Sequence, residues 1–202
     1  TLKGEGVREF LHGQTTADIR KATLNNFIRC FWLSTSGEIR CLLEIVMNEN
    51  GADIVVLSGN QLELWEGFNN VIFPADKVEM EPIKLIRRVQ RLSFEESWKE
   101  SEVKWLSNQE TLPRHLLSLT IANEDEYNKW RFIQGYIFDN KAINLETNPF
   151  EIGLNDLISI DKGCYLGQEK IARLIRSDFL KKELRYWECE EVILDEQELL
   201  NN

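Results

Sequence analysis

The sequence predicts an α+β fold in which strands and helices alternate along the chain. Short runs rich in β-branched and aromatic residues alternate with runs that place apolar residues at helical spacing. The alternation starts again after a polar stretch at 93–113, so the chain divides into two similar α/β halves. Its 202 residues, of which 43% are hydrophobic and 29% charged, suffice for one large or two small globular units.

The first half is expected to contain two helices and four strands. Residues 7–12 form a short helix closed by Gly13, and residues 61–70 form a second one, with Leu62 and Trp65 at helical spacing. Asn48-Glu49-Asn50-Gly51 is typical of a hairpin turn and should join two of the strands directly. The strands are expected at 27–33, 39–47, 53–58 and 83–92.

The second half follows the polar stretch, which is rich in glutamate and predicts a helical surface excursion or a linker. A strand is expected at 116–121, a helix at 124–134 ended by Gly135, and a last strand at 184–189. We therefore divide the chain into a first α/β half, a linker or excursion, a second α/β half and a short terminal segment. These are residues 1–92, 93–115, 116–183 and 184–202.

Composition argues against several classes of function. The net charge of −10 argues against general nucleic-acid binding. No apolar run is long enough to span a bilayer, and the chain shows no signal peptide, so no membrane partner is expected. Thr1 is not an initiator Met and lies close to the first motif, so we expect further residues to precede it.

The cysteines favour a reducing compartment over a disulfide framework or a zinc site, because none of them forms a C-x-x-C pair. They are Cys30, Cys41, Cys164 and Cys189. The two histidines, His12 and His115, lack the spacing of metal ligands. We therefore expect no metal held by this chain alone, and we expect His12 to lie on the surface.

The stretch Lys162-Gly163-Cys164-Tyr165-Leu166-Gly167-Gln168-Glu169 concentrates the side chains best suited to chemistry. It leads into a helix predicted at 168–176, whose apolar face would carry Ile171, Leu174 and Ile175. Cys164 would then lie just before a helix N-terminus, where exposed N–H groups favour an anion. Lys162 would add a positive charge, and both effects would lower the pKa of the thiol.

The neighbours of Cys164 fit a reactive thiol. Gly163 and Gly167 permit positive φ and the close approach of a ligand or a second backbone. Gln168 and Glu169 would occupy the first helical turn, where a glutamate also complements the helix dipole. The alternative is that the cysteine is only a small residue in a tight turn, since free cysteines are usually buried and inert.

Basic residues gather around this stretch. Residues 162–185 hold seven Lys or Arg and three acids, a local net charge of +4 in a chain whose net charge is −10. This basic island would receive an anionic ligand tail or an acidic partner, but a solvated helix face would explain the same charges. Contacts to an anionic tail are expected from Lys170, Arg173, Lys181 and Lys182.

Four segments share their order and spacing with one known family. Residues 162–169 match a Lys-Gly-Cys-Tyr-x-Gly-Gln-Glu signature, and Phe10-Leu11-His12-Gly13-Gln14-Thr15-Thr16-Ala17-Asp18 matches an FLxGQxTxD segment. Ser36-Gly37-Glu38-Ile39 matches a GR-I/V turn, with Glu38 where Arg is usual, and Leu145-Glu146-Thr147-Asn148 followed by Ile158-Ser159 matches the approach to the signature. In these segments the chain resembles the YgfZ-like folate-binding family, relatives of the glycine-cleavage T-protein, an aminomethyltransferase.

The resemblance runs from about Gly4 to Leu184 and implies an aminomethyltransferase-type fold that binds tetrahydrofolate or a derivative. Proteins of this family carry a further C-terminal β-barrel, of which residues 184–202 would be the start. We expect either that the rest of the barrel lies beyond this sequence or that this protein is shortened.

The resemblance also implies which branch of the family fits best. T-proteins clamp the pterin with an acid in an LR-x-E-x-G segment, because a carboxylate accepts two parallel hydrogen bonds from the pterin N–H edge. The matching segment here is Trp130-Arg131-Phe132-Ile133-Gln134-Gly135, with Ile133 in place of that acid. T-proteins also lack the Lys-Gly-Cys signature. Both differences favour the branch that assists iron–sulfur cluster assembly and repair.

The same resemblance implies the site residues. Cys164 would be the functional thiol, as ligand, redox group or partner contact, and Lys162 would assist it as the second catalytic residue. Glu146 is the nearest candidate carboxylate for the folate, although an acid capping the turn at Asn148-Pro149 would explain it equally well. The residues expected to bind the ligand are Tyr165, Gly163, Gly167, Gln168, Glu169, Glu146 and Arg131.

Three hypotheses for the function follow. The first is a folate-binding accessory protein that supports iron–sulfur cluster assembly or repair, with the assembly machinery or client enzymes as partners. The second is a folate-dependent aminomethyltransferase-like enzyme, for which Ile133 predicts weak or absent turnover. The third is a scaffold that binds a partner through the basic island without chemistry. The expected location is the cytoplasm, or an organelle matrix in a eukaryote.

Overall fold

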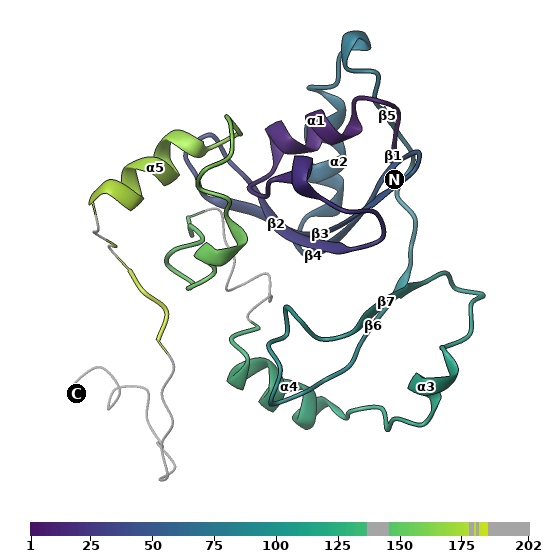
Figure 1. The fold of residues 1–202 in the computed structure, drawn as a ribbon. Coiled ribbons are helices and arrows are strands. Elements are labelled where there is room, and N and C mark those ends of the chain that lie inside the picture. The colour runs from purple at the N-terminus through teal and green to yellow at the C-terminus, as the bar shows by residue number, and fades with distance from the viewer. Residues whose placement is uncertain (137–145, 178–179, 181, 186–202) are drawn as a thin grey trace, which may run out of the picture.

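The computed structural model describes residues 1–136, 146–177, 180 and 182–185 (Figure 1). Its main body is a five-stranded antiparallel sheet in the order β2-β3-β4-β1-β5. The strands are β1 (Leu2–Lys3), β2 (Phe27–Leu33), β3 (Ile39–Asn48), β4 (Gly51–Gly59) and β5 (Glu79–Met80).

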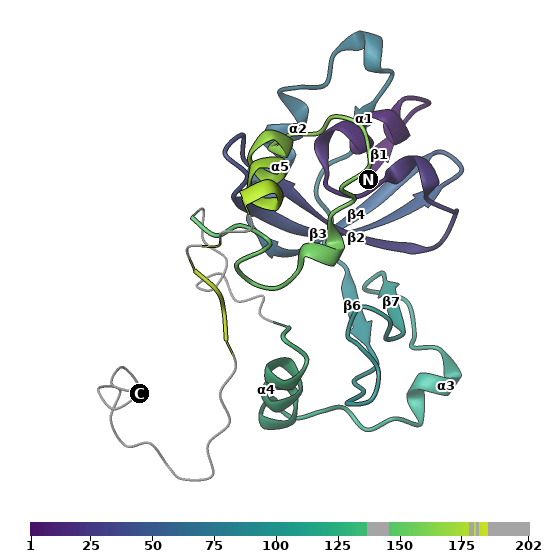
Figure 2. The same cartoon turned by 60° about the vertical axis from the view of Figure 1, so that its left-hand side comes forward.

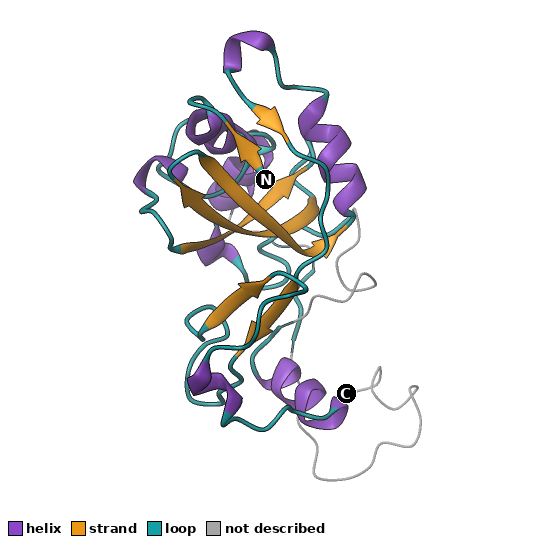
Figure 3. Ribbon diagram, turned by 90° about the vertical axis from the view of Figure 1, so that its right-hand side faces the viewer, coloured by secondary structure: helices purple, strands orange, loops and turns teal. Residues whose placement is uncertain are grey.

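Helices α1 (Val7–Gln14) and α2 (Gln61–Asn69) cover one face of this sheet. A smaller antiparallel sheet, made of β6 (Arg87–Gln90) and β7 (Val103–Leu106), lies beyond the other face, as Figures 2 and 3 show. The remaining helices are α3 (Arg114–Leu117), α4 (Glu124–Ile133) and α5 (Gln168–Ser177), with 3-10 turns η1 (Ile19–Lys21), η2 (Pro74–Asp76) and η3 (Asn155–Leu157).

The strands β2 and β3 are largely apolar along both faces because both faces of the sheet are covered there. On β2, Cys30 and Trp32 pack in one core with residues of α1 and α2. Phe31 and Leu33, which alternate with them, pack in a second core that includes Trp98 and residues of the segment 154–171. The sheet is thus a middle layer, and it brings the C-terminal third of the chain onto the strands of the first half.

The predicted elements of the first half are confirmed with small shifts in their bounds. The hairpin turn is present, since Asn48 pairs with Gly51 at the junction of β3 and β4. Helix α1 continues through Gly13 and ends at Gln14, two residues beyond the predicted end at residue 12. The strand expected at 83–92 is shorter and corresponds to β6.

Glu44 of β3 joins the two sheets through a buried ion cluster. Its side chain is fully buried, and Arg29 of β2 and Arg88 of β6 contact it at 2.7 Å each. Trp105 of β7 donates its indole N–H to Glu44 Oε2 at 3.1 Å. Burial alone would raise the pKa of Glu44, but the hydrogen bonds and charges of the two arginines outweigh it and lower this pKa.

The second half departs from the prediction in two places. The strand expected at 116–121 is wrong, because Leu116 and Leu117 belong to α3 and a loop follows. Ile121 is 89% exposed, so its apolar side chain has no sheet to pack against. The stretch 93–113, every residue of which is described, contains β7 and no helix, so a helical excursion is wrong there as well.

The helices expected at 124–134 and 168–176 are confirmed as α4 and α5. Helix α4 begins with a capping box, in which Asn123 Oδ1 accepts from the Glu126 N–H and Glu126 Oε2 accepts from the Asn123 N–H, both at 2.9 Å. The last predicted strand, 184–189, lies outside the described residues from position 186 onward, as does Cys189. A C-terminal barrel is not evident in the described part of the chain.

Candidate functional site

Two motifs far apart in the sequence form one structural unit. The N-terminal segment 12–18, at the end of α1, lies against the segment 157–167 that contains the signature. Leu166 N–H donates to the Gly13 carbonyl at 3.1 Å, and Ser159 N–H donates to the Thr16 carbonyl at 2.9 Å. Thr16 Oγ1 in turn donates to the Leu157 carbonyl at 2.9 Å. The two segments therefore hold each other in place along their length.

Lys162 is the centre of this unit. Its side chain is buried, and Nζ donates to the carbonyl oxygens of His12 at 2.6 Å, Thr15 at 2.5 Å and Ala17 at 2.7 Å. The ammonium also lies 4.8 Å from the centre of the Tyr165 ring. Because α1 ends at Gln14, this cation satisfies carbonyl groups at and just beyond the negative end of the helix dipole.

The three carbonyl acceptors give the Lys162 ammonium a structural task. Burial lowers its pKa to about 8, so the ammonium is still mostly charged at pH 7 and can donate to all three carbonyls. All three of its N–H donors are used within the N-terminal segment. The expected assistance to Cys164 therefore has no donor available in this arrangement, and it stays a prediction.

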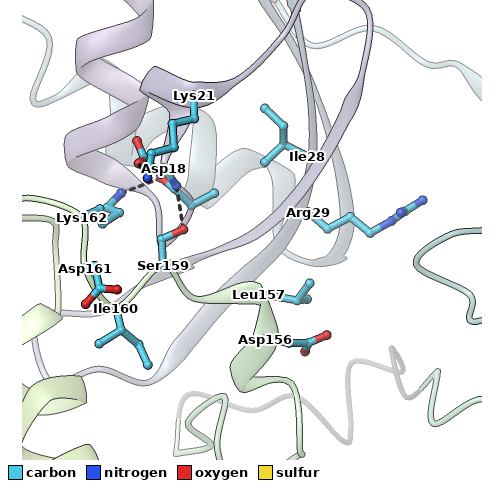
Figure 4. A pocket seen from close by; sticks show the side chains of 11 residues that line it. Asp18, Lys21, Ile28, Arg29, Asp156, Leu157, Ser159, Ile160, Asp161 and Lys162 are labelled. Carbon is cyan, nitrogen blue, oxygen red and sulfur yellow. Dashed lines mark hydrogen bonds and ion pairs between the residues drawn. The ribbon is translucent and has the colours of Figure 1, made fainter.

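A cavity of about 480 Å³ lies beside this unit, between the start of the first half and the segment 156–162 (Figure 4). Its apolar walls are Ile28, Leu157 and Ile160, and its polar walls include Ser159. The charged residues that line it are Asp18, Lys21, Arg29, Asp156, Asp161 and Lys162. Of the residues expected to form the site, Lys162 is the one that reaches this cavity.

The positive charges of the cavity are largely committed to other groups. Arg29 donates to Glu44 and to the Lys99 carbonyl, and Figure 4 shows its guanidinium directed away from the other labelled side chains. Lys162 is held by the carbonyls of the N-terminal segment. Lys21 is 84% exposed and pairs with Asp18 Oδ2 at 3.0 Å. The available polar groups of the cavity are therefore mainly carboxylates.

His12 is buried, so its expected surface position is wrong. Its side chain is 5% exposed, and Nδ1 lies 3.3 Å from Asp18 Oδ1. The two atoms make no hydrogen bond with each other, and both are buried without a hydrogen-bond partner among the described residues. Burial, then the charge of Lys162, lowers the pKa of His12, which keeps the imidazole neutral near pH 7.

The described thiols differ sharply in access. Cys164 is exposed in the loop before α5, whereas Cys30 and Cys41 are buried in the main sheet. Burial raises the pKa of both strand thiols to about 12. Cys30 and Cys41 are thus shielded from solvent, whereas Cys164 is accessible.

The start of α5 is set by a close approach of two backbones. Gly167 has φ of +81°, and a Cβ placed on it would lie 2.5 Å from the Ser34 carbonyl oxygen of the β2–β3 turn. Only glycine fits this contact without a shift of the backbone. Gln168 and Glu169 occupy the first helical turn, as expected, with Gln168 half-buried and Glu169 exposed.

The other predicted ligand residues are scattered. Tyr165 is buried in the second core, Glu146 is exposed, and Gly163 lies against the His12 ring. Arg131 lies on α4, where its guanidinium covers the Tyr127 ring at 5.6 Å. None of these residues lines the cavity beside Lys162. Ile133, also on α4, is 48% exposed and is not part of that cavity.

Apart from the buried Lys162, the described basic residues of the island face solvent. Lys170, Arg173 and Lys182 are exposed, and Lys181 lies outside the described residues. In the described part of the chain, no group of three or more His, Cys, Asp or Glu is placed to hold a metal ion. No helix there is long and apolar enough to cross a membrane.

Sequence reasoning missed Asp18, Ser159, Asp156 and Asp161 as site residues. Asp18 and Ser159 both fall in segments that the sequence marks as motifs, but their pairing depends on contacts across 141 positions. The Asp18 N–H donates to Ser159 Oγ at 3.0 Å and joins the two motifs at the wall of the cavity (Figure 4). Single-sequence periodicity contains no signal for such a contact.

Comparison with known proteins supports the fold. No family model matches the chain. A stretch of 58 residues is 43% identical to a chloroplastic protein of Arabidopsis thaliana named "putative transferase", covering 29% of this chain and 13% of that protein. The crystal structure of glycine cleavage system aminomethyltransferase T from Bartonella henselae is similar over 87% of this chain, with a TM-score of 0.60 and 10% identity. The chain spans 60% of that structure's length. The fold predicted from the sequence is thereby confirmed: this chain has the fold of aminomethyltransferase T.

Proposed function

We propose that this chain is a folate-binding protein of the aminomethyltransferase type and that the cavity beside Lys162 receives the folate. The observation that carries the proposal is that cavity, formed where the two folate-family motifs meet in a T-protein fold. Lys162 and the paired segments 12–18 and 157–167 shape it. A binding function therefore explains why the two motifs are held together.

The chemistry of the cavity fits a reduced folate. A volume of about 480 Å³ falls in the usual range for small-molecule sites. Ile28, Leu157 and Ile160 offer apolar walls for a flat ring system, and the carboxylates at the rim accept hydrogen bonds from ring N–H groups. A bound tetrahydrofolate would supply the nitrogen atoms that carry a one-carbon unit.

The cavity can be tested by blocking it. Ile160 is 53% exposed at its wall, so Ile160→Glu should place a charge in the ligand's path with little cost to folding. Isothermal titration calorimetry with tetrahydrofolate should show one binding site on the wild type. The variant should bind at least tenfold more weakly, a loss of about 1.4 kcal/mol in binding free energy. Ile175→Glu, at a 38% exposed position of α5, is the matched control. Absence of binding to the wild type would overturn the proposal.

A second candidate is the accessory role in iron–sulfur cluster assembly or repair, which one observation favours. Cys164, in the signature, is exposed, while Cys30 and Cys41 are buried. An exposed thiol in the signature suits a redox group, a ligand or a partner contact better than a packing role. In a cell that lacks the protein, the activity of iron–sulfur enzymes should fall and should be restored by the wild type but not by Cys164→Ser. Full restoration by that variant would contradict this role for the thiol.

A further inference from the structure

The available hydrogen-bonding groups of the cavity are acceptors rather than donors. Arg29 and Lys162 use their donors on Glu44 and on backbone carbonyls. Asp161 makes no ion pair or hydrogen bond with the described residues, and the half-exposed Asp156 pairs among them with Lys99. An anionic tail would be repelled by these carboxylates, above all by Asp161. A ligand edge with N–H donors would match them.

Asp18 is the acid best placed to receive such an edge. It lies at the junction of the two motifs, where its N–H is fixed by Ser159 Oγ at 3.0 Å. Its Oδ1 faces His12 and is buried without a hydrogen bond, and Oδ2 is held by Lys21 at 3.0 Å. Because Oδ1 is buried against the His12 ring, Oδ2 is the oxygen of this carboxylate that a ligand can reach.

The partner of Asp18 Oδ2 is easily replaced. The Lys21 side chain is 84% exposed, and ion pairs with such exposed groups contribute only about 0–1 kcal/mol. A ligand N–H that enters the cavity would exchange this solvated pair for a more buried, charge-assisted hydrogen bond. The hydrogen bond from Lys21 lowers the pKa of Asp18, so this carboxylate is an acceptor at neutral pH.

We propose that Asp18 receives the N–H edge of the pterin in this chain, and that the Lys21 ammonium leaves the carboxylate when the ligand binds. The inference rests on the proposed folate function and adds the orientation of the bound folate in the cavity. The pterin enters toward Asp18, and the glutamate tail stays at the open side of the cavity. Asp18 thereby supplies the carboxylate that is missing at Ile133.

Three ligands separate the parts of the folate. They are tetrahydrofolate, a tetrahydropterin without the tail, and p-aminobenzoylglutamate, which has the tail and no pterin. In calorimetric titrations, Asp18→Asn should lower the affinity for tetrahydrofolate and for the tetrahydropterin by about ten- to a hundredfold. This is the usual effect of losing a hydrogen bond to a charged group. The affinity for p-aminobenzoylglutamate should stay unchanged. Asp156→Asn, which removes an exposed acid of the same cavity, is the matched control. It should change the affinities for tetrahydrofolate and the tetrahydropterin by less than about threefold.

A second variant should strengthen ligand binding instead of weakening it. Lys21→Gln removes the competing ammonium, so tetrahydropterin should bind about two- to fivefold more tightly, as expected for loss of an exposed ion pair. If Lys21 instead held the glutamate tail, the same variant would weaken tetrahydrofolate and p-aminobenzoylglutamate. Because Lys21 is exposed, this arm also decides the question if Asp18→Asn fails to fold.

The outcomes distinguish the inference from the function on which it rests. Binding of tetrahydrofolate to the wild type, with equal affinity in Asp18→Asn and in Lys21→Gln, would overturn the role of Asp18 and leave the folate function intact. No binding of any of the three ligands to the wild type would overturn both. Binding of p-aminobenzoylglutamate but not of tetrahydropterin would reverse the orientation and contradict the inference.

Discussion

Lys162 and Ala17 are 145 positions apart in the sequence, yet the Lys162 ammonium donates a hydrogen bond to the Ala17 carbonyl oxygen at 2.7 Å. The same ammonium bonds the carbonyls of His12 and Thr15. The signature lysine thus joins the C-terminal motif to the end of α1, together with the backbone hydrogen bond from Leu166 to Gly13. Because the cavity lies against this contact, the integrity of the site should depend on it.

Replacing Lys162 should cost stability first. Lys162→Met keeps the length of the side chain but leaves three carbonyl groups without their donor. Each unsatisfied buried group costs about 1–3 kcal/mol, so the free energy of unfolding in urea should fall by about 3 kcal/mol or more. Lys182→Met, at an exposed position, is the control and should stay within about 0.5 kcal/mol of the wild type. Equal stability of the two variants would contradict the structural task of Lys162.

Removing the buried charge that joins the two sheets should also destabilise the fold. Glu44→Gln leaves Arg29 and Arg88 buried without their counter-ion, which typically costs about 3–5 kcal/mol. Glu63 forms an exposed ion pair with Arg40 at the longer distance of 3.6 Å. Glu63→Gln should therefore lower the free energy of unfolding by less than about 1 kcal/mol. Chemical unfolding of both variants measures the difference. A loss no larger in Glu44→Gln than in Glu63→Gln would show that the cluster does not hold the sheets together.

The thiols should react in the order of their access. At pH 7 a thiol with a pKa of about 12 is thiolate in only about one molecule in 10⁵, and Cys30 and Cys41 are also buried. Iodoacetamide should therefore label Cys164 before either of them, as read by peptide mapping. Denatured protein, in which all these thiols are exposed, serves as the control. Earlier labelling of Cys30 or Cys41 in the native protein would contradict the structure.

His12 should make the fold sensitive to mild acid. Because its pKa is lowered in the folded state, the unfolded chain takes up a proton on this residue at a higher pH than the folded chain does. The stabilisation that depends on neutral His12 is therefore complete above about pH 6.5 and is lost as the pH falls below that value. His12→Gln, which cannot titrate, should show a shallower fall in thermal stability between pH 6.5 and 5 than the wild type. An identical slope in both proteins would mean that His12 titrates alike in the folded and unfolded states.

Local patterns predicted the parts of the fold in which neighbours along the chain decide the structure. The hairpin at Asn48 to Gly51 and the helices α1, α2, α4 and α5 follow from turn residues, caps and apolar spacing. The strand expected at 116–121 failed because its apolar residues find no partner sheet, as the exposure of Ile121 shows. Apolar alternation predicts a strand only where a second layer covers it.

The site was predictable to a smaller extent. The signature and the FLHGQTTAD segment stood out in the sequence, and both lie at the cavity through Lys162 and Asp18. The roles of these residues cannot be predicted from the sequence. The burial of His12 and the contact of Asp18 with Ser159 arise only when residues about 140 positions apart meet. The residue types were informative, and the pairings required the fold.

A crystal structure of the protein with tetrahydrofolate tests the proposed function most directly. We predict a pterin in the cavity between Ile28 and Ile160, with an N–H group within hydrogen-bonding distance of Asp18 and the Lys21 ammonium turned away. The contacts of Lys162 with the N-terminal segment should be unchanged. A folate bound elsewhere, for example against α4 near Ile133 with the cavity empty, would contradict the account.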